Sequence, residues 1–164
     1  MKAKFGYDNN MAVPKITKVV LNVGIGKAKD DPKIAELVEN TLKRISGQKP
    51  IYTLSKKSIS AFKVREGMKV GLKVTLRGAR MWDFLTKLVT IALPRVRDFR
   101  GLDPKSVDGH GNLNIGFKEH MVFPEIKSDE VEKIHGLEIA VSNSAANQEE
   151  GLELFKFLGF PFKK

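Results

Sequence analysis

The clearest pattern in the chain is the strict alternation of apolar and polar residues from Met68 to Arg77. A period of two is typical of a β-strand with one face on a core and the other in solvent. We therefore expect a strand whose exposed face is rich in hydrogen-bond donors. The apolar face would carry Val70, Leu72, Val74 and Leu76, and the polar face Lys69, Gly71, Lys73, Thr75 and Arg77.

A second strand is predicted at Pro14–Gly24, where β-branched residues partly alternate. Its buried face would carry Val19, Leu21 and Val23, and its other face Lys18, Val20 and Asn22. Shorter strands are predicted at Pro50–Leu54, Leu113–Phe117 and Leu137–Ser142.

Helices are predicted where apolar residues recur with a spacing near 3.6. The first follows Asp31, a candidate N-cap, and Pro32, and stops at Gly47. The second follows Gly78, which ends the preceding strand, and runs until Pro94 stops it. The third covers Gln148–Leu158 with a capping box of Asn147 and Glu150. Because strands and helices mix without regular alternation, we expect an α+β fold: a single, mainly antiparallel sheet with helices packed on one face.

The charge of the chain is concentrated in its first two thirds. The net charge is +10, but residues 1–105 hold 23 basic and 9 acidic side chains, whereas residues 106–164 hold 6 and 10. Between Lys43 and Arg80, 11 basic residues face only Glu66. Such clustering favours a polyanionic partner over a merely solvated surface, and it leaves RNA, DNA and membrane open.

The stretch Gly24-Ile-Gly-Lys27 follows a predicted strand and precedes a predicted helix, as a phosphate-binding loop does. A Walker loop also needs a glycine where Leu21 stands and a hydroxyl where Ala28 stands. The dinucleotide fingerprint needs a third glycine at Lys29. We therefore interpret the glycines as a strand-ending turn that uses their backbone freedom, and keep a phosphate-handling or nucleotide-handling enzyme as the alternative.

Other catalytic and metal sites have no support in the sequence. There are no cysteines, and the three histidines lack the i, i+4 spacing of a helical metal site. The acidic clusters Asp129–Glu132 and Glu149–Glu150 lack an apolar setting that would raise a carboxyl pKa. We therefore expect that the chain is not an enzyme and that it binds neither a metal nor a cofactor. The absence of an apolar run of ~20 residues and of a signal sequence predicts a soluble intracellular protein with no membrane partner.

The residue types indicate which RNA the chain would bind. A sheet that stacks on single-stranded bases presents aromatic residues, and the predicted polar faces carry none. Lys, Arg, Thr and Asn instead suit phosphates, 2′-hydroxyls and base edges of folded RNA. Packing would account for most of the other aromatics, namely Trp82, Phe84, Phe155, Phe157 and Phe160. Phe62 is the exception, because it lies inside the basic loop at 55–67 as a contact or a loop anchor. We expect residues 1–164 to form a single RNA-binding domain.

Seven segments, taken together and in order, resemble a known family: KVVLNVGIGKA, ISGQKP, KKSISAFKVREGM, KVTLRGARMWDFL, ALPRVRDFRGL, FPEI and GFPF. The chain resembles the bacterial form of the universal large-subunit ribosomal protein numbered five, the 5S rRNA-binding protein of the central protuberance. The resemblance covers almost the whole chain. That family usually begins with a further helix of about four turns, whereas this sequence reaches its first strand soon after Lys2-Ala-Lys-Phe-Gly-Tyr7.

The resemblance implies a structural protein of the cytoplasmic ribosome with three contacts, and it also implies other central protuberance components as partners. The open face of the sheet would bind 5S rRNA, and the tip of the basic loop would reach the P-site tRNA. A bridge to the small-subunit protein numbered thirteen is assigned to the His110 turn and the acidic C-terminal part. The 5S rRNA positions are Lys18, Asn22, Gln48, Lys49, Lys73, Thr75 and Arg77, and the tRNA positions are Phe62, Lys63, Val64 and Arg65.

Overall fold

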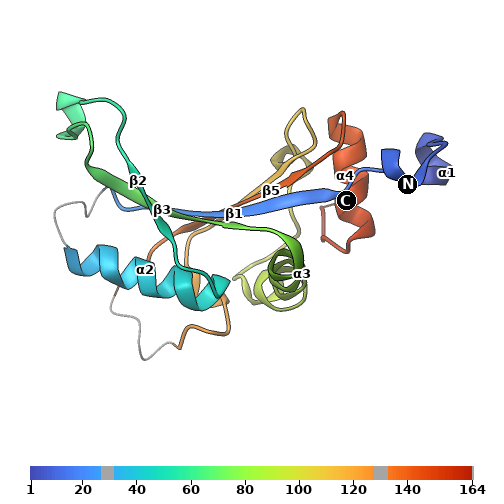
Figure 1. The fold of residues 1–164 in the computed structure, drawn as a ribbon. Helices are drawn as coiled ribbons and strands as arrows, with labels where there is room; N and C mark the ends of the chain where they lie inside the picture. Colours follow the sequence, from blue (N-terminus) through green and yellow to red (C-terminus); the bar gives the residue numbers. More distant parts are fainter. Residues whose placement is uncertain (27–31, 128–132, 164) are drawn as a thin grey trace. The chain divides into compact units, whose positions relative to one another are not determined.

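The computed structural model describes residues 1–26, 32–127 and 133–163. Four helices and five strands are joined by short helical turns (Figure 1). In chain order they are α1 (Lys2–Phe5), β1 (Ile16–Gly24), α2 (Pro32–Ser46), β2 (Ile51–Leu54), β3 (Lys69–Leu76), α3 (Gly78–Lys87), β4 (Leu113–Phe117), β5 (Leu137–Asn143) and α4 (Gln148–Phe157). No helix among these residues is long and apolar enough to span a bilayer.

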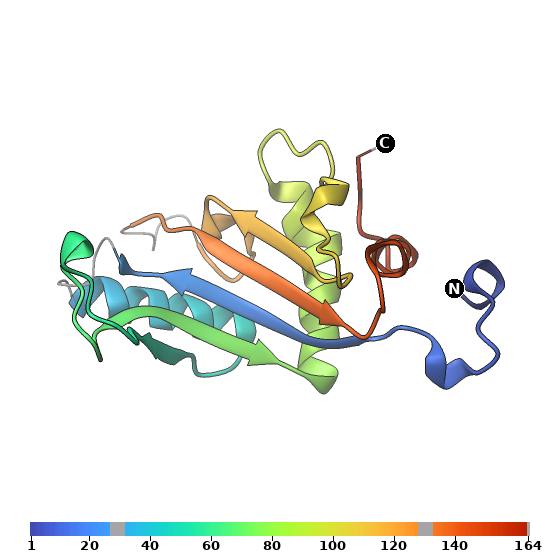
Figure 2. The ribbon, with the colours of Figure 1, turned by 90° about the horizontal axis from the view of Figure 1, so that it is seen from above.

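The five strands form one antiparallel sheet in the order β2-β3-β1-β5-β4 (Figure 2). In the β2–β3 pair, Ile51 faces Lys73 and Thr53 faces Gly71, and the register shifts between Thr53 and Leu54. The sheet and the helices confirm the predicted α+β class. The predicted strands are found within two residues of their expected bounds, whereas the Asp31 cap lies outside the described residues.

The chain divides by its internal packing into two compact units. Unit 1 comprises residues 1–19, 76–115 and 139–164, and unit 2 comprises residues 20–75 and 116–138. The division crosses four of the strands, so each unit contains only part of the sheet and is described by itself. The single RNA-binding domain over 1–164 stays a prediction.

Unit 2 is built on the apolar faces predicted from the alternation. Leu21, Val23, Leu72 and Val74 are all at most 2% exposed. Helix α2 runs along this side of the strands (Figure 1). It contributes its own apolar stripe of Val38, Leu42 and Ile45. Because side chains alternate along a strand, burying these residues turns their neighbours to the other side.

Two stacked histidines lie in unit 2, of which His120 is buried and His135 is half-buried. The rings of His120 and His135 lie 3.9 Å apart and nearly parallel. The backbone N–H of His135 donates to Nδ1 of His120 at 3.3 Å, and His135 Nδ1 lies 3.2 Å from the carbonyl of Gly136. His135 Nε2 is buried without a partner among the described residues. Burial first, and the neighbouring His120 second, lower the pKa of His135 to about 4, and burial lowers the pKa of His120.

Unit 1 takes its core from α3, the inner residues of β4 and β5, and α4. The helical run of α3 continues through a π turn (Leu88–Ala92) and a tight turn (Leu93–Arg95), so it ends one residue beyond the predicted stop at Pro94. Asn147 caps α4 by accepting from the N–H of Glu150 at 2.9 Å, as predicted. Packing accounts for Phe84, Phe155 and Phe160, which are at most 4% exposed, as predicted. For Trp82 and Phe157 the prediction is wrong, because they are 45% and 62% exposed.

A close backbone contact in unit 1 joins α4 to the turn before β4. A Cβ at Gly151 would overlap the backbone of Gly111, and the φ of Gly111 is +80°. The carbonyl of Gly111 also accepts from Asn143 Nδ2 at 2.6 Å. The turn and the helix can therefore meet only because both residues lack a side chain.

Replacing Gly151 by alanine should lower the free energy of unfolding by ~1–3 kcal/mol, the usual cost of overpacking. Helix propensity alone would stabilise the variant by about 1 kcal/mol, so the sign of the change separates the two effects. Urea unfolding measures the change in the free energy of unfolding. The matched control is Gly116→Ala, where a Cβ meets nothing. Stabilisation by Gly151→Ala would contradict the contact.

The histidine pair should make stability depend on pH. The pKa of His135 is about 4 in the folded chain and near 6.5 when exposed, so the unfolded state binds more protons between these values. The contribution of neutral His135 to the free energy of unfolding should be fully present above pH 6.5 and should be lost as the pH drops toward 4. Between pH 7 and 5 the free energy of unfolding should fall by at most about 2 kcal/mol. Denaturant unfolding at several pH values measures the slope.

The slope should flatten in His135→Asn and persist in the control His110→Asn, because His110 is exposed. Equal slopes in the wild type and His135→Asn would show that the pair does not titrate as described.

Candidate nucleic-acid interface

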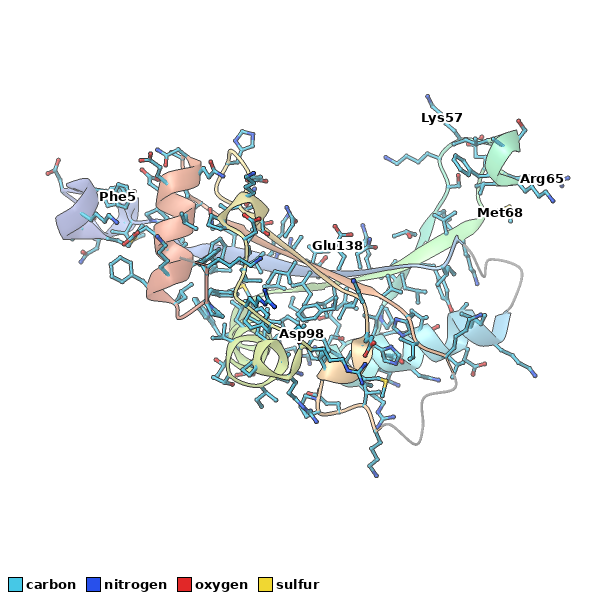
Figure 3. All side chains as sticks on the ribbon, turned by 180° about the vertical axis from the view of Figure 1, so that it is seen from behind. Phe5, Lys57, Arg65, Met68, Asp98 and Glu138 are labelled. Carbon is cyan, nitrogen blue, oxygen red and sulfur yellow. The ribbon has the colours of Figure 1, made fainter. Side chains whose placement is uncertain are left out.

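The sheet residues of unit 2 that point away from α2 form a mixed polar face, here called the open face. Its residues are Val20, Asn22, Ile51, Thr53, Gly71, Lys73, Thr75 and Glu138. Lys73 and Glu138 are exposed, whereas Asn22 and Thr75 are half-buried. Figure 3 shows Glu138 on the side of the strands away from α2. No aromatic side chain belongs to the open face, so it offers no base-stacking platform.

The turn after α2 brings two of the predicted site residues together. Gly47 ends the helix with a φ of +64°, and the hydroxyl of Ser46 accepts from the N–H of Gln48 at 3.2 Å. Gln48 Nε2 then donates to the backbone carbonyl of Thr75 at 3.3 Å. The adjacent Lys49 is exposed. A residue from the helix end thus lies against β3, 27 positions away in sequence.

Asn22 is held from the neighbouring strand. Its Nδ2 donates to Oε2 of Glu138 in β5 at 3.3 Å. Glu138 was not among the residues predicted from the sequence. The alternation of Leu137–Ser142 does place Glu138 opposite the buried Leu137 and Ile139, but an acidic residue gave no reason to assign it to an anionic ligand.

Five of the seven predicted 5S rRNA residues belong to unit 2: Asn22, Gln48, Lys49, Lys73 and Thr75. The other two are in unit 1, where Lys18 is half-buried in β1 and the exposed Arg77 precedes α3. The structure therefore groups the five, and the role of all seven stays a prediction.

Next to the open face, β2 is tied to α2 by a tyrosine. The hydroxyl of Tyr52 donates to Glu39 at 2.7 Å, and this hydrogen bond, with burial, raises the pKa of the phenol. The ammonium of Lys69 lies 4.2 Å from the ring centre. One exposed cation is thereby held in place at the start of β3.

Residues Ser55–Gly67, here called the arm, connect β2 to β3 and project from the sheet of unit 2 (Figure 1). The sequence predicted a basic loop here, and the structure adds one cross-strand bridge within it. The N–H groups of Ile59 and Val64 each donate to the other residue's carbonyl, at 2.8 and 3.2 Å. At the base, the N–H of Ser55 donates to Met68 and that of Gly67 donates to Ser55.

The tip of the arm presents cations around an exposed aromatic ring. A tight turn (Ser60–Phe62) precedes Lys63, whose φ is +50°, and Phe62 is 72% exposed. The labelled Lys57 and Arg65 extend away from the sheet in Figure 3. Val64 is half-buried. The four predicted tRNA residues thus lie in one turn of the chain, with their cations in solvent.

The glycine turn after β1 borders an apolar hollow of about 840 Å³. Gly24 and Gly26 line it with Ile25, the start of α2, the arm and residues 133–136. Neither glycine has a positive φ, and a Cβ at either would meet nothing, so the explanation by backbone freedom is wrong. The strand does end at Gly24, as predicted. Lys27 lies outside the described residues.

This hollow has little that could bind or transform a phosphate. Among its described lining residues only Lys133 and His135 could be charged, and the low pKa of His135 leaves that ring neutral at pH 7. No group of three acidic, histidine or cysteine side chains in the described ranges could hold a metal ion. The geometry gives no support to the enzymatic alternative.

Comparison with known proteins gives one consistent result. Residues 9–65 match the family model "Ribosomal protein L5", and residues 69–162 match the model of the C-terminus of the same ribosomal protein family. Similar proteins include the large ribosomal subunit protein uL5 of Halothermothrix orenii, 56% identical over 98% of this chain and 90% of the relative. The uL5 of Colwellia psychrerythraea is 52% identical over 100% and 91%, and that of Syntrophomonas wolfei 53% over 99% and 92%.

Proposed function

The chain belongs to the ribosomal protein L5 family, and from this membership we propose that it binds 5S rRNA through the open face of unit 2. Its relatives are components of the large ribosomal subunit, so the chain is a structural protein of that subunit and has rRNA as a partner. The prediction that it is not an enzyme is confirmed by the family. That it attaches 5S rRNA in the central protuberance of a cytoplasmic ribosome is part of the proposal.

The observation that carries the proposal is the grouping of Asn22, Gln48 and Thr75 in unit 2. Asn22 and Thr75 lie on the neighbouring strands β1 and β3, and Gln48 is hydrogen-bonded to Thr75. Lys49 and Lys73 are exposed beside them. Short polar side chains between cations suit an RNA duplex, with the amides and the hydroxyl near base edges or riboses and the ammonium groups near phosphates.

The arm is assigned to the P-site tRNA as a second part of the proposal. Its basic side chains are exposed, and Glu66 is the only acidic residue of the arm itself. The N–H of Glu66 donates to Ser58 Oγ at 3.0 Å. The cross-strand bonds hold the tip in one geometry, so little ordering entropy is lost when it meets a fixed target.

The bridge to the small-subunit protein numbered thirteen is assigned to the His110 turn of unit 1. Asp108 accepts from the N–H groups of His110 and Asn112 at 2.9 and 2.8 Å. Burial acts to raise the Asp108 pKa, but these bonds and the amide of Asn112 together lower it. A preformed acidic turn suits a basic partner surface.

Replacing Asn22 or Thr75 by alanine should weaken 5S rRNA binding by ~1–3 kcal/mol if each contacts a base or sugar. A mobility-shift titration with excess tRNA as competitor measures the loss, and wild-type affinity should fall linearly in log salt. The controls are Asn40→Ala and Thr86→Ala, on exposed positions of α2 and α3. Unchanged affinity in both site variants would remove them from the interface, and equal wild-type binding to any duplex would contradict specific recognition.

Replacing Lys63 and Arg65 together by alanine should spare 5S rRNA binding yet impair tRNA placement in the P site, because the arm would lose its tip cations. Binding of tRNA to reconstituted ribosomes measures the effect. The matched control, Lys118→Ala with Lys127→Ala, removes the same charge from exposed positions of unit 2. A parallel loss of 5S rRNA affinity would mean that the arm contacts 5S rRNA instead.

A further inference from the structure

The open face carries one acidic side chain amid residues that suit an anion. Among the strand residues described in unit 2, Glu138 is the only acidic one. It is exposed and lies on the side away from α2 (Figure 3). A carboxylate there opposes the binding of RNA phosphates. Its position therefore needs an explanation other than attraction to the RNA backbone.

The explanation begins with its contact to Asn22. An ionised carboxylate can only accept hydrogen bonds, so the amide atom 3.3 Å from it must be the nitrogen. The amide plane then turns Oδ1 away from Glu138. In the part of the chain that the structure describes, the Asn22 side chain makes no other hydrogen bond, so this oxygen remains able to accept.

The side-chain amide of Gln48 is oriented in the same way. Its Nε2 donates to the carbonyl of Thr75, so that the protein also uses an amide nitrogen here. Two amides of the proposed site thus offer their oxygens to a ligand. Phosphates carry only acceptors, whereas ribose 2′-hydroxyls and exocyclic amines of bases are donors.

We propose that Glu138 determines specificity at this site: it fixes the Asn22 amide as an acceptor and excludes phosphate from that position. The RNA group received at Asn22 is a donor, namely a ribose 2′-hydroxyl or the exocyclic amine of guanine, which the wide minor groove of an RNA duplex displays. Lys49 and Lys73 take the phosphates on either side. This inference rests on the proposed binding of 5S rRNA.

The first test compares Glu138→Gln with the control Glu36→Gln, which removes an equal charge from an exposed position of α2. Affinities for 5S rRNA and for an unrelated RNA duplex are measured at several salt concentrations. In Glu138→Gln the ratio of the two affinities should fall about tenfold, because the unrelated duplex binds more tightly while 5S rRNA does not. The control should keep the wild-type ratio.

An equal rise in affinity for both RNAs in Glu138→Gln would mean that Glu138 only repels phosphates in general, and it would overturn the inference. Unchanged affinities for both RNAs would overturn it as well. A wild-type chain that binds the two RNAs equally is a separate outcome, which overturns the proposed function and the inference with it.

The second test asks directly which RNA group meets Asn22. Interference mapping uses 5S rRNA with 2′-deoxy, inosine or phosphorothioate substitutions; inosine lacks the exocyclic amine of guanine. At least one 2′-deoxy or inosine interference seen with the wild type should disappear in Asn22→Ala and weaken in Glu138→Gln, while phosphorothioate interferences stay. Loss of a phosphorothioate interference alone in Asn22→Ala would overturn the inference.

Discussion

The candidate interface depends on the burial of one side of the central strands against α2. Leu21, Val23, Leu72 and Val74 are removed from water, and full burial of such side chains contributes about 1.5–3 kcal/mol each. A slip of one residue in either strand would turn that strand's buried pair to the open side. The same constraint that stabilises unit 2 therefore decides that Asn22, Lys73 and Thr75 point away from the core. The candidate interface is a consequence of the core and needs no separate scaffold.

The open face is refined by a few local hydrogen bonds. Glu138 orients Asn22, and the backbone of Thr75 holds Gln48. Gly71 leaves room for Thr53, whose hydroxyl would lie 2.8 Å from a Cβ there. The side chains that would meet RNA are thereby held before binding, which lowers the entropy lost on association. Positive charge is supplied by the exposed Lys73 on this face and by Lys49 beside it. The cations of the arm form a second, separate set.

Most of the fold could be predicted because alternation and helical spacing report directly which side of an element is buried. The faces of β1 and β3 and the strand bounds follow from that information, and the α4 cap follows from the capping box of Asn147 and Glu150. Contacts between distant segments could not be predicted. The stacking of His120 on His135, the approach of Gly151 to Gly111 and the bond from Asn22 to Glu138 each join residues whose own neighbours in sequence carry no sign of the partner. For the same reason, the exposure of Trp82 and Phe157 was missed: helical spacing identifies a face, but not its edge.

The central claim is that 5S rRNA lies on the open face of unit 2 and not on α2. The chain has no cysteine, so single cysteines can be placed freely and tethered to an iron chelate that cleaves nearby RNA. One variant carries Thr53→Cys on the open face, and the other carries Glu36→Cys on α2. The account predicts site-specific cleavage of bound 5S rRNA from position 53 and none from position 36. Cleavage from position 36 with none from position 53 would contradict it.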